Sequence, residues 1–404
     1  ALHDISDGGM VTSLIEMMFA GNCGLKIKLD YALDDLKKNL FSEEPGLILQ
    51  LSNESYEELL DFLKDISFTK ISKVGETISE TKLILEALDY KEQFSFKELM
   101  ANWSKVSISI KKLRDNPLDA EQEEKSYLDK ETNILKQHIN FLIPKRIDNF
   151  SKPSLAVIRE QGVNGHTEMA AAFSTAGFEV TDIHMNDLLS QKFNLKDFQG
   201  IIFPGGFSFG DVLGAGKGWA NFILNNSLLK NQFEEFFSKK ESFSLGVCNG
   251  CQVLSNLKEI IPGTDNWPKL KNNSSGQFEA RLTQIKIFKS NSLLFDDMEN
   301  SQLLVPVAHG EGKMIFSNPE KVSKNNQLVM SYVDTAGNQT ESYPGNPNGS
   351  EKGITGICSE DGKVTIMMPH PERAFLNAQL SWTDLGDKGF SPWIKMFHNA
   401  RKYF

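Results

Sequence analysis

A cysteine at a predicted strand-to-helix bend is the residue of this chain best placed for covalent chemistry. The apolar run Ser244–Val247 predicts a strand, Cys248 follows it, and Gly250 leads into an amphipathic helix. At a helix N-terminus, free N–H groups and the positive end of the helix dipole favour thiolate over thiol. A glycine beside the bend allows a turn that a Cβ would obstruct. The pattern therefore predicts a nucleophile elbow with Cys248 as the nucleophile.

A histidine and a glutamate near the C-terminus supply the matching base. His370 follows an apolar run and stands between Pro369 and Pro371, and Glu372 comes two residues after it. In an extended backbone, residues two apart project to the same side. A carboxylate beside an imidazole can keep one ring nitrogen protonated, which leaves the other free to take a proton from sulfur. We therefore predict a catalytic triad of Cys248, His370 and Glu372.

A pair of glycines follows another predicted strand, Ile201–Pro204. The N–H groups of Gly205 and Gly206 are unshielded by side chains, so this loop is a candidate oxyanion site. The partner donor would be the N–H of Asn249, directly after the nucleophile. The alternative is that the two glycines form only a tight turn.

The spacing of Cys248 and Cys251 is C-x-x-C, a pattern that also occurs in metal and redox sites. A zinc site needs a second pair, and the remaining cysteines, Cys23 and Cys358, are far apart in the sequence. A thioredoxin-like dithiol is the stronger rival, because it too lies at a helix N-terminus. That rival leaves His370 without a role, and we interpret Cys251 as a small buried helix residue.

Composition narrows the class of protein. The 404 residues carry a net charge of −10 with no long basic block, which argues against a nucleic-acid partner. Four cysteines make no disulfide framework, and a working thiolate needs a reducing compartment. No apolar run approaches the roughly 18 residues that span a bilayer, and no signal sequence is visible. We expect a cytoplasmic enzyme of two or three domains, without a membrane partner.

Three regions separate along the chain. Residues 1–92 mix a helix at Met10–Phe19 with strands such as Gly46–Leu51 and Lys82–Leu85. Residues 93–152 predict an amphipathic helix that ends near Arg114, followed by a charged linker or surface helix from residue 119 to residue 137. Residues 153–404 alternate predicted strands and helices, and a hairpin near the C-terminus delivers His370. This alternation is typical of an α/β fold with a doubly wound, mostly parallel sheet, where ligands bind at the carboxyl ends of the strands.

At this point the motifs resemble a known family. The cysteine and histidine motifs, Gly246–Gln252 and Pro369–Arg373, resemble the glutaminase domain of the class I (triad) glutamine amidotransferases. Other runs resemble the large single-chain phosphoribosylformylglycinamidine synthases of purine biosynthesis. These runs are His3–Gly9, Leu113–Pro117, Val157–Asn164, Gly206–Gly216, Gln277–Arg281, Ala308–Gly312 and Ser391–Trp393.

The resemblance implies a flavodoxin-like glutaminase domain over 153–404, preceded by a partial α+β lobe of the aminoimidazole-ribonucleotide-synthetase C-terminal type. It implies glutamine as substrate and ammonia delivery to upstream synthetase domains, where ATP and Mg²⁺ drive the conversion of formylglycinamide ribonucleotide to formylglycinamidine ribonucleotide. Glutamine hydrolysis itself needs no cofactor. Most of the ATP site lies outside this chain, which we expect to be a C-terminal fragment.

Substrate contacts are expected at several further positions. Gln252 lies one helical turn past the nucleophile and is a candidate for binding the amino-acid end of glutamine. The resemblance suggests the same for Phe207, Asn273, Ser275 and Phe278, and places His309 near the active site or the synthetase interface. It also makes Asp4 a candidate metal-phosphate contact, against the alternative of an exposed Asp-rich turn.

Other functions remain open from the sequence. A glutaminase for another acceptor would lack the synthase-like runs, and a silent module that only docks a synthetase would have lost a triad residue. A dithiol oxidoreductase would need Cys251 as well as Cys248.

Overall fold

The computed structural model describes residues 1–64, 66, 71–128, 135–145 and 152–404. Their contacts divide the chain into two compact units. Unit 1 comprises Ala1–Ile110 with Glu124–Asn133, and unit 2 comprises Lys111–Glu123 with Ile134–Phe404. The predicted nucleophile, base and glycine loop all fall in unit 2.

Unit 2 is built on a nine-stranded sheet in the order β13-β12-β15-β16-β17-β10-β9-β7-β8. Five neighbouring strands are parallel, and their order is that of flavodoxin-like folds. These strands are β7 (Ser154–Arg159), β8 (Glu179–His184), β9 (Gly200–Phe203), β10 (Phe243–Val247) and β17 (Val364–Met367). Four of them, β7, β9, β10 and β17, are buried and largely apolar runs rather than alternating ones, whereas the edge strand β8 is only partly buried. The predicted doubly wound sheet is confirmed in this half.

The other four strands run antiparallel to their neighbours, and three of them, β12, β13 and β15, were not expected from the sequence. They are β12 (Glu279–Ile287), β13 (Gln302–His309), β15 (Leu328–Tyr332) and β16 (Ile354–Cys358). The sheet is therefore mixed rather than mostly parallel. The predicted hairpin is confirmed as the antiparallel pair β16 and β17.

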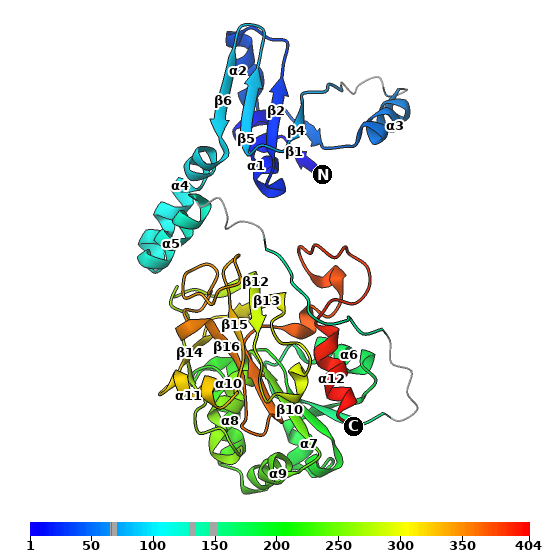
Figure 1. Ribbon diagram of the computed structural model, residues 1–404, viewed down its shortest axis with the longest axis vertical. Coiled ribbons are helices and arrows are strands. Elements are labelled where there is room, and N and C mark those ends of the chain that lie inside the picture. The colour runs from blue at the N-terminus through cyan, green and yellow to red at the C-terminus, as the bar shows by residue number, and fades with distance from the viewer. Residues whose placement is uncertain (65, 67–70, 129–134, 146–151) are drawn as a thin grey trace. The chain divides into compact units, whose positions relative to one another are not determined.

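Helices cover both faces of this sheet. In Figure 1, α8 (Lys217–Leu224) and α10 (Asn249–Asn256) lie on one side of β10, and α6 (His166–Thr175) and α12 (Ile394–Lys402) lie on the other. The burial of α6 follows helical spacing, with Met169, Ala172 and Phe173 in the core. The remaining elements of unit 2 are α7 (Met185–Leu189), α9 (Ser227–Ser238), β11 (Lys269–Lys271), β14 (Lys313–Ile315) and α11 (Pro319–Lys324).

Unit 1 has a separate core around the four-stranded sheet β4-β2-β5-β6. Its strands and helices are β1 (Leu2–Asp4), α1 (Gly9–Gly21), β2 (Gly24–Lys28), α2 (Leu33–Phe41), β3 (Leu47–Leu49), α3 (Asn53–Leu63), β4 (Gly75–Ile78), β5 (Lys82–Glu86) and β6 (Lys91–Ser95). The helix predicted from Met10 is α1, and the strand predicted from Lys82 is β5. This is the α+β lobe expected from the sequence.

Two helices follow this lobe. The amphipathic pattern from Phe96 gives α4 (Phe96–Arg114), which ends at the predicted residue. The charged stretch after it gives α5 (Pro117–Leu128), and part of the predicted linker lies outside the described residues. The turn between these helices belongs to unit 2 although it was predicted as linker, because its contacts are made with that unit.

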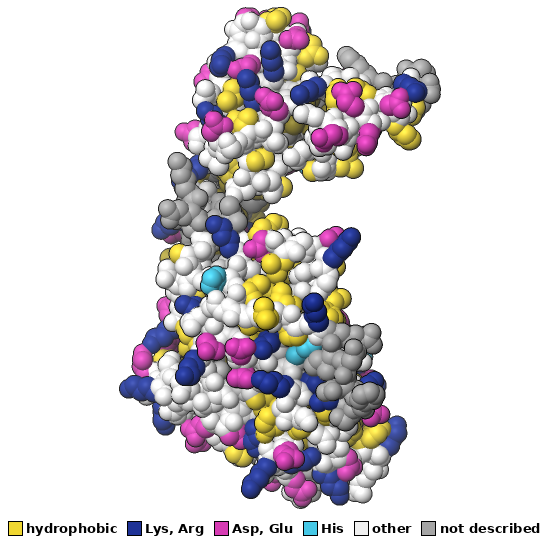
Figure 2. Space-filling view, turned by 45° about the vertical axis from the view of Figure 1, so that its right-hand side comes forward, with side chains coloured by type: hydrophobic (Ala, Val, Ile, Leu, Met, Phe, Trp, Pro, Cys, Tyr) yellow, Lys and Arg dark blue, Asp and Glu magenta, His cyan; other side chains and the backbone are white. Residues whose placement is uncertain are grey.

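No helix in the described part of the chain is both long enough and apolar enough to cross a membrane. On the face drawn in Figure 2, Lys and Arg side chains lie interspersed with Asp and Glu rather than gathered into one patch.

Candidate active site

Cys248 lies at the carboxyl end of the central strand β10, at the sharp bend that the sequence predicts. Its backbone has φ 51° and ψ −107°, a conformation that non-glycine residues rarely adopt and that is found at nucleophile elbows. Gly250 permits this bend, because a Cβ at that position would lie 1.8 Å from the carbonyl oxygen of Phe203. Helix α10 begins directly after the bend, at Asn249. The cysteine therefore stands at a helix N-terminus beside a buried strand.

His370 and Glu372 form a buried hydrogen-bonded pair at the end of the neighbouring strand β17. His370 Nδ1 lies 2.6 Å from Glu372 Oε1, and both side chains are almost fully buried. The pairing predicted from the sequence is present, but the reason given for it was wrong. The backbone is not extended there, because residues 371–373 form a 3₁₀ turn that brings the two side chains together.

The environment of His370 favours the imidazolium. Burial lowers its pKa, but the charges of Glu372 and Cys248 oppose that effect and raise the pKa of His370 to about 10. A protonated His370 beside a cysteine sulfur is the resting arrangement of a thiolate–imidazolium pair.

Gly205 marks the point at which the nucleophile and the base converge. A Cβ on Gly205 would lie 2.7 Å from His370 Cε1 and 3.5 Å from Cys248 Cβ, so the two side chains approach one point from neighbouring strands. Cys248 Sγ itself lies 3.4 Å from the carbonyl oxygen of Ala308. The absence of a side chain at position 205 leaves room for the pair.

Two backbone donors stand beside the thiol. Gly206 follows β9 and Asn249 opens α10, and no described residue accepts a hydrogen bond from either N–H. Gly206 has φ 148°, a conformation that favours glycine. These are the donors predicted for an oxyanion.

A cavity of about 230 Å³ opens in front of Cys248. Its walls include five residues that the sequence made candidates for the oxyanion site or for substrate binding: Gly206, Phe207, Gln252, Phe278 and His309. Phe207 and Phe278 are about half exposed, and their ring centroids lie 6.1 Å apart. The cavity walls also include Asp211, Ala215, Asn272, Gly276, Gln277, Ala308, Gly310 and Glu311.

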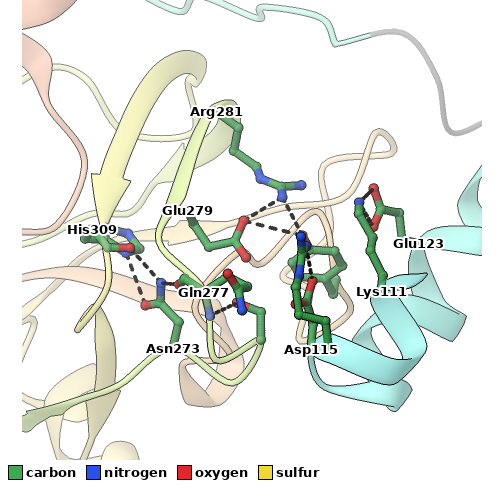
Figure 3. Close-up of polar contacts among 11 residues, drawn as sticks. Lys111, Asp115, Glu123, Asn273, Gln277, Glu279, Arg281 and His309 are labelled. Carbon is green, nitrogen blue, oxygen red and sulfur yellow. Dashed lines mark hydrogen bonds and ion pairs between the residues drawn. The ribbon is translucent and has the colours of Figure 1, made fainter. Parts of the chain in front are cut away.

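Asn273 and Ser275, also predicted as substrate contacts, are buried beneath the cavity wall instead of lining it. Asn273 Nδ2 donates to the carbonyl oxygens of His309 at 2.7 Å and Gln277 at 2.9 Å, and Figure 3 shows these side chains together. Ser275 Oγ accepts a hydrogen bond from the Gln277 N–H. Both residues hold the loop that carries Gln277 and Phe278.

His309 is held in one tautomer by Asn273. Asn273 Oδ1 accepts the Gly312 N–H at 3.0 Å and lies 3.2 Å from His309 Nδ1, so Nδ1 carries the proton. His309 Nε2 is then a buried acceptor without a hydrogen-bond partner among the described residues. Burial, together with the nearby charge of His370, lowers the pKa of His309 to about 3. The ring is neutral at physiological pH and cannot act as a cationic donor.

Two carboxylates in the cavity wall were not assigned a role from the sequence. Asp211 has φ 54° in the loop after β9, and Glu311 lies in the loop between β13 and β14. Burial and the charge of Glu311 raise the pKa of Asp211. The sequence feature that could have identified these two acids is their position within the glycine-rich runs Gly206–Gly216 and Ala308–Gly312. Loops that follow strands commonly carry binding and catalytic residues.

The turn between α4 and α5 supports the cavity from outside. Asn116 Nδ2 donates to the carbonyl oxygen of Ser274 at 2.9 Å, and the Asn116 N–H donates to that of Ser275 at 3.3 Å. Gln122 Oε1 accepts the Tyr343 N–H at 2.7 Å. The segment Lys111–Glu123 therefore fixes the loop that forms one wall of the cavity.

An ion pair between Lys111 and Glu123 joins the two ends of this turn, and a second ion pair, between Glu279 and Arg281, lies beside it. Lys111 pairs with Glu123 at 2.6 Å, and Figure 3 shows that pair beside the group formed by Glu279 and Arg281, which pair at 2.5 Å. All four of these side chains are at least 70% buried, so the contacts are those of a folded core rather than a solvated hinge.

The remaining predictions, for the second cysteine of the C-x-x-C motif and for a metal contact, concern residues that do not line the cavity. Cys251 is fully buried, and its burial, together with nearby Cys248, raises the pKa of the Cys251 thiol well above the usual range. The side chain of Asp4 is 75% exposed and lies 3.6 Å from His3 Nδ1. No group of three potential metal-ligating side chains occurs among the residues described here. A metal contact at Asp4 stays a prediction.

Comparison with known proteins agrees with this division of the chain. Residues 152–404 match the CobB/CobQ-like glutamine amidotransferase domain, and residues 1–87 match the C-terminal domain of AIR synthase related proteins. PurLQS from Thermotoga maritima is 25% identical, covers 63% of this chain and 99% of its own, and has a TM-score of 0.49. A glutamine amidotransferase from Thermotoga maritima is 18% identical, covers 55% of this chain and 77% of its own, and has a TM-score of 0.34.

Proposed function

This chain belongs to the family of CobB/CobQ-like glutamine amidotransferases, and on that premise we propose that it hydrolyses glutamine with Cys248 as the nucleophile. The observation that carries the proposal is the buried His370–Glu372 pair, 2.6 Å apart, which meets Cys248 at Gly205. A histidine oriented by a carboxylate next to a cysteine at an elbow is the machinery of acyl transfer.

In the first step, Cys248 Sγ attacks the side-chain carboxamide carbon of glutamine. The carbonyl oxygen becomes an oxyanion that accepts hydrogen bonds from the N–H groups of Gly206 and Asn249. His370, protonated through its partner Glu372, donates a proton to the nitrogen as the C–N bond breaks. Ammonia leaves, and a glutamyl thioester remains on Cys248.

In the second step, water adds to the thioester carbon. Neutral His370 takes a proton from this water, and the C–S bond breaks to release glutamate and the thiolate. Every group that these steps require comes from the ends of three neighbouring parallel strands, which is where ligands bind in doubly wound sheets. Glutamine hydrolysis accordingly needs no cofactor in this proposal.

The acceptor of the ammonia is the second part of the proposal. A glutamine amidotransferase domain and an AIR synthase related domain occur in one chain, together with the synthase-like runs of the sequence. This combination supports a role in phosphoribosylformylglycinamidine synthase, a ligase of purine biosynthesis. The ammonia would replace the formyl amide oxygen of formylglycinamide ribonucleotide after ATP activates it, giving ADP and phosphate.

The synthetase domains of that enzyme are the expected partner, and the reducing cytoplasm is the expected compartment because the thiolate must stay reduced. ATP and Mg²⁺ belong to the synthetase reaction. The exposed Asp4 and the lack of a three-ligand cluster among the described residues do not fit a metal-nucleotide site. We therefore assign no step to ATP or to a metal in this chain.

Two alanine variants test the proposal. Glutamate release from glutamine should be abolished in Cys248→Ala and retained in Cys251→Ala, because only Cys248 faces the cavity and Cys251 is fully buried. Loss of activity in both variants would instead favour the dithiol oxidoreductase. Glutamate release that persists in Cys248→Ala would refute the proposal.

A further inference from the structure

Two carboxylates and a neutral histidine share the cavity wall with the nucleophile. Asp211 and Glu311 come from separate loops, and each is only partly buried. The cavity wall contains no Lys or Arg, and no ion pair joins either carboxylate to a described cation. The cavity therefore carries negative charge that the described residues do not neutralise.

Both carboxylates are held in place by neutral donors. Asp211 Oδ1 accepts a hydrogen bond from Asn249 Nδ2 at 3.3 Å, and Glu311 Oε2 accepts the Ala215 N–H at 3.2 Å. A carboxylate has about four lone-pair sites, so each retains acceptor capacity after these contacts.

Gln252 fixes the spacing between the two loops. Its Oε1 accepts from Asn249 Nδ2 at 3.0 Å, and its Nε2 donates to the carbonyl oxygen of Glu311 at 2.7 Å. The amide of Gln252 is thus engaged within the protein, and its role is to tie the acidic loops to the helix that follows Cys248. The acceptors are preorganised relative to the nucleophile.

His309 Nε2 adds a further acceptor with no partner of its own among the described residues. Its side chain is 2% exposed, and its protonation on Nδ1 leaves the Nε2 lone pair free. A buried acceptor without a partner is costly unless a ligand supplies the donor. The three acceptors together favour a ligand with a positively charged group that carries several N–H donors.

We propose that Asp211 and Glu311 bind the α-ammonium group of the amide substrate and so restrict it to amides that carry a free α-amino group. This inference rests on the proposed function and names the part of the substrate recognised away from the reacting carbon. An ammonium offers three N–H donors and one positive charge, which matches the two carboxylates and the lone pair of His309. A substrate without that group leaves two partly buried negative charges in the cavity wall without a cation.

Protection of Cys248 from alkylation tests the inference without requiring turnover. The wild-type chain, Asp211→Asn, Glu311→Gln and the control Glu241→Gln are treated with iodoacetamide. Each is tested with glutamine and with glutaramate, which is glutamine without its α-amino group. Both cavity variants keep a carbonyl acceptor for their neutral donors, and Glu241 is an exposed carboxylate outside the cavity wall.

Wild type and Glu241→Gln should be protected by glutamine at concentrations about 10–100-fold lower than Asp211→Asn or Glu311→Gln require, the range expected for one charged hydrogen bond. Glutaramate should protect all four proteins equally weakly. The midpoint of thermal unfolding checks that each variant is folded. If only one of the two cavity variants folds, that variant alone is enough for the test.

The experiment separates a failure of this inference from a failure of the proposed function. Equal protection of wild type and both variants by glutamine would overturn this inference and leave the proposed function standing. No protection of wild type by either compound would overturn both.

Discussion

At the scale of single residues, the proposed chemistry depends on three side chains, and short motifs were enough to select them. Cys248 follows a strand and precedes Gly250, and His370 and Glu372 lie two residues apart. Asp211 and Glu311 could not be assigned in the same way. They lie about 100 residues apart in the sequence, and only the folded sheet brings both into the cavity wall.

The pH dependence of hydrolysis should report the His370–Glu372 pair. The pKa of His370 is raised to about 10 with Glu372 as the largest raising contribution, so the imidazolium that protonates the leaving nitrogen is present below that pH and lost above it. Glu372→Gln should move the alkaline limb of the kcat profile to lower pH, measured by glutamate release between pH 6 and about pH 10. An alkaline limb unchanged in the variant would contradict this account of the pair.

At the scale of elements, the strands and helices near the site were predictable because their apolar spacing is local. The parallel strands, the C-terminal hairpin and the end of α4 at Arg114 all follow from it. The antiparallel half of the sheet and the docking of Lys111–Glu123 did not follow. The pairings of β12 with β13 and β15 join residues 16 to 47 positions apart, and Asn116 contacts Ser274 across 158 positions; a single sequence gives no direct signal for either.

A methyl group on Gly205 should disable the site without unfolding the protein. Its Cβ would lie 2.7 Å from His370 Cε1, so Gly205→Ala must displace the imidazole from Cys248. We expect kcat to fall by roughly 100-fold or more, since a displaced base loses most general acid–base catalysis. The comparison is Gly21→Ala, outside the cavity wall, where a Cβ would lie 3.3 Å from Cys23 Sγ and would meet no other atom within 4 Å. Wild-type kcat in Gly205→Ala would show that His370 does not lie where the account places it.

The turn between α4 and α5 should control the cavity wall through Asn116. Asn116→Ala removes the side-chain hydrogen bond to the Ser274 carbonyl oxygen and should raise KM for glutamine about 3–10-fold, with a smaller effect on kcat. Lys125→Ala, a change at an exposed position of α5, the helix that follows Asn116, is the control. A variant whose KM equals that of the control would mean that the loop keeps its position without Asn116.

At the scale of the whole molecule, the chain consists of two units with separate hydrophobic cores. The sequence predicted a lobe, a linker and a glutaminase domain, with boundaries at 92 and 152. Contacts divide the middle segment differently, because Lys111–Glu123 packs with the glutaminase unit. Composition and hydrophobic periodicity show where the pattern of strands and helices changes along the sequence. They do not indicate which unit the turn between two helices contacts.

Two units with separate cores should unfold in two calorimetric transitions. The core of unit 1 is much the smaller, so its transition should come at the lower temperature. Glutamine added to Cys248→Ala, which binds without turnover, should raise only the upper midpoint, by up to about 2.7 kcal/mol of stabilisation at a hundredfold excess over Kd. A single transition that shifts as a whole would contradict this independence.

The central claim is that Cys248 forms a covalent acyl intermediate with glutamine, and mass spectrometry of the intact chain tests it most directly. Wild type and Cys251→Ala, quenched in acid after mixing with glutamine, should each carry the added mass of one glutamyl group. Peptide mapping should place that group on Cys248, and Cys248→Ala should carry none. A glutamyl group on another residue, or a Cys248→Ala protein that acquires the same mass, would contradict the account.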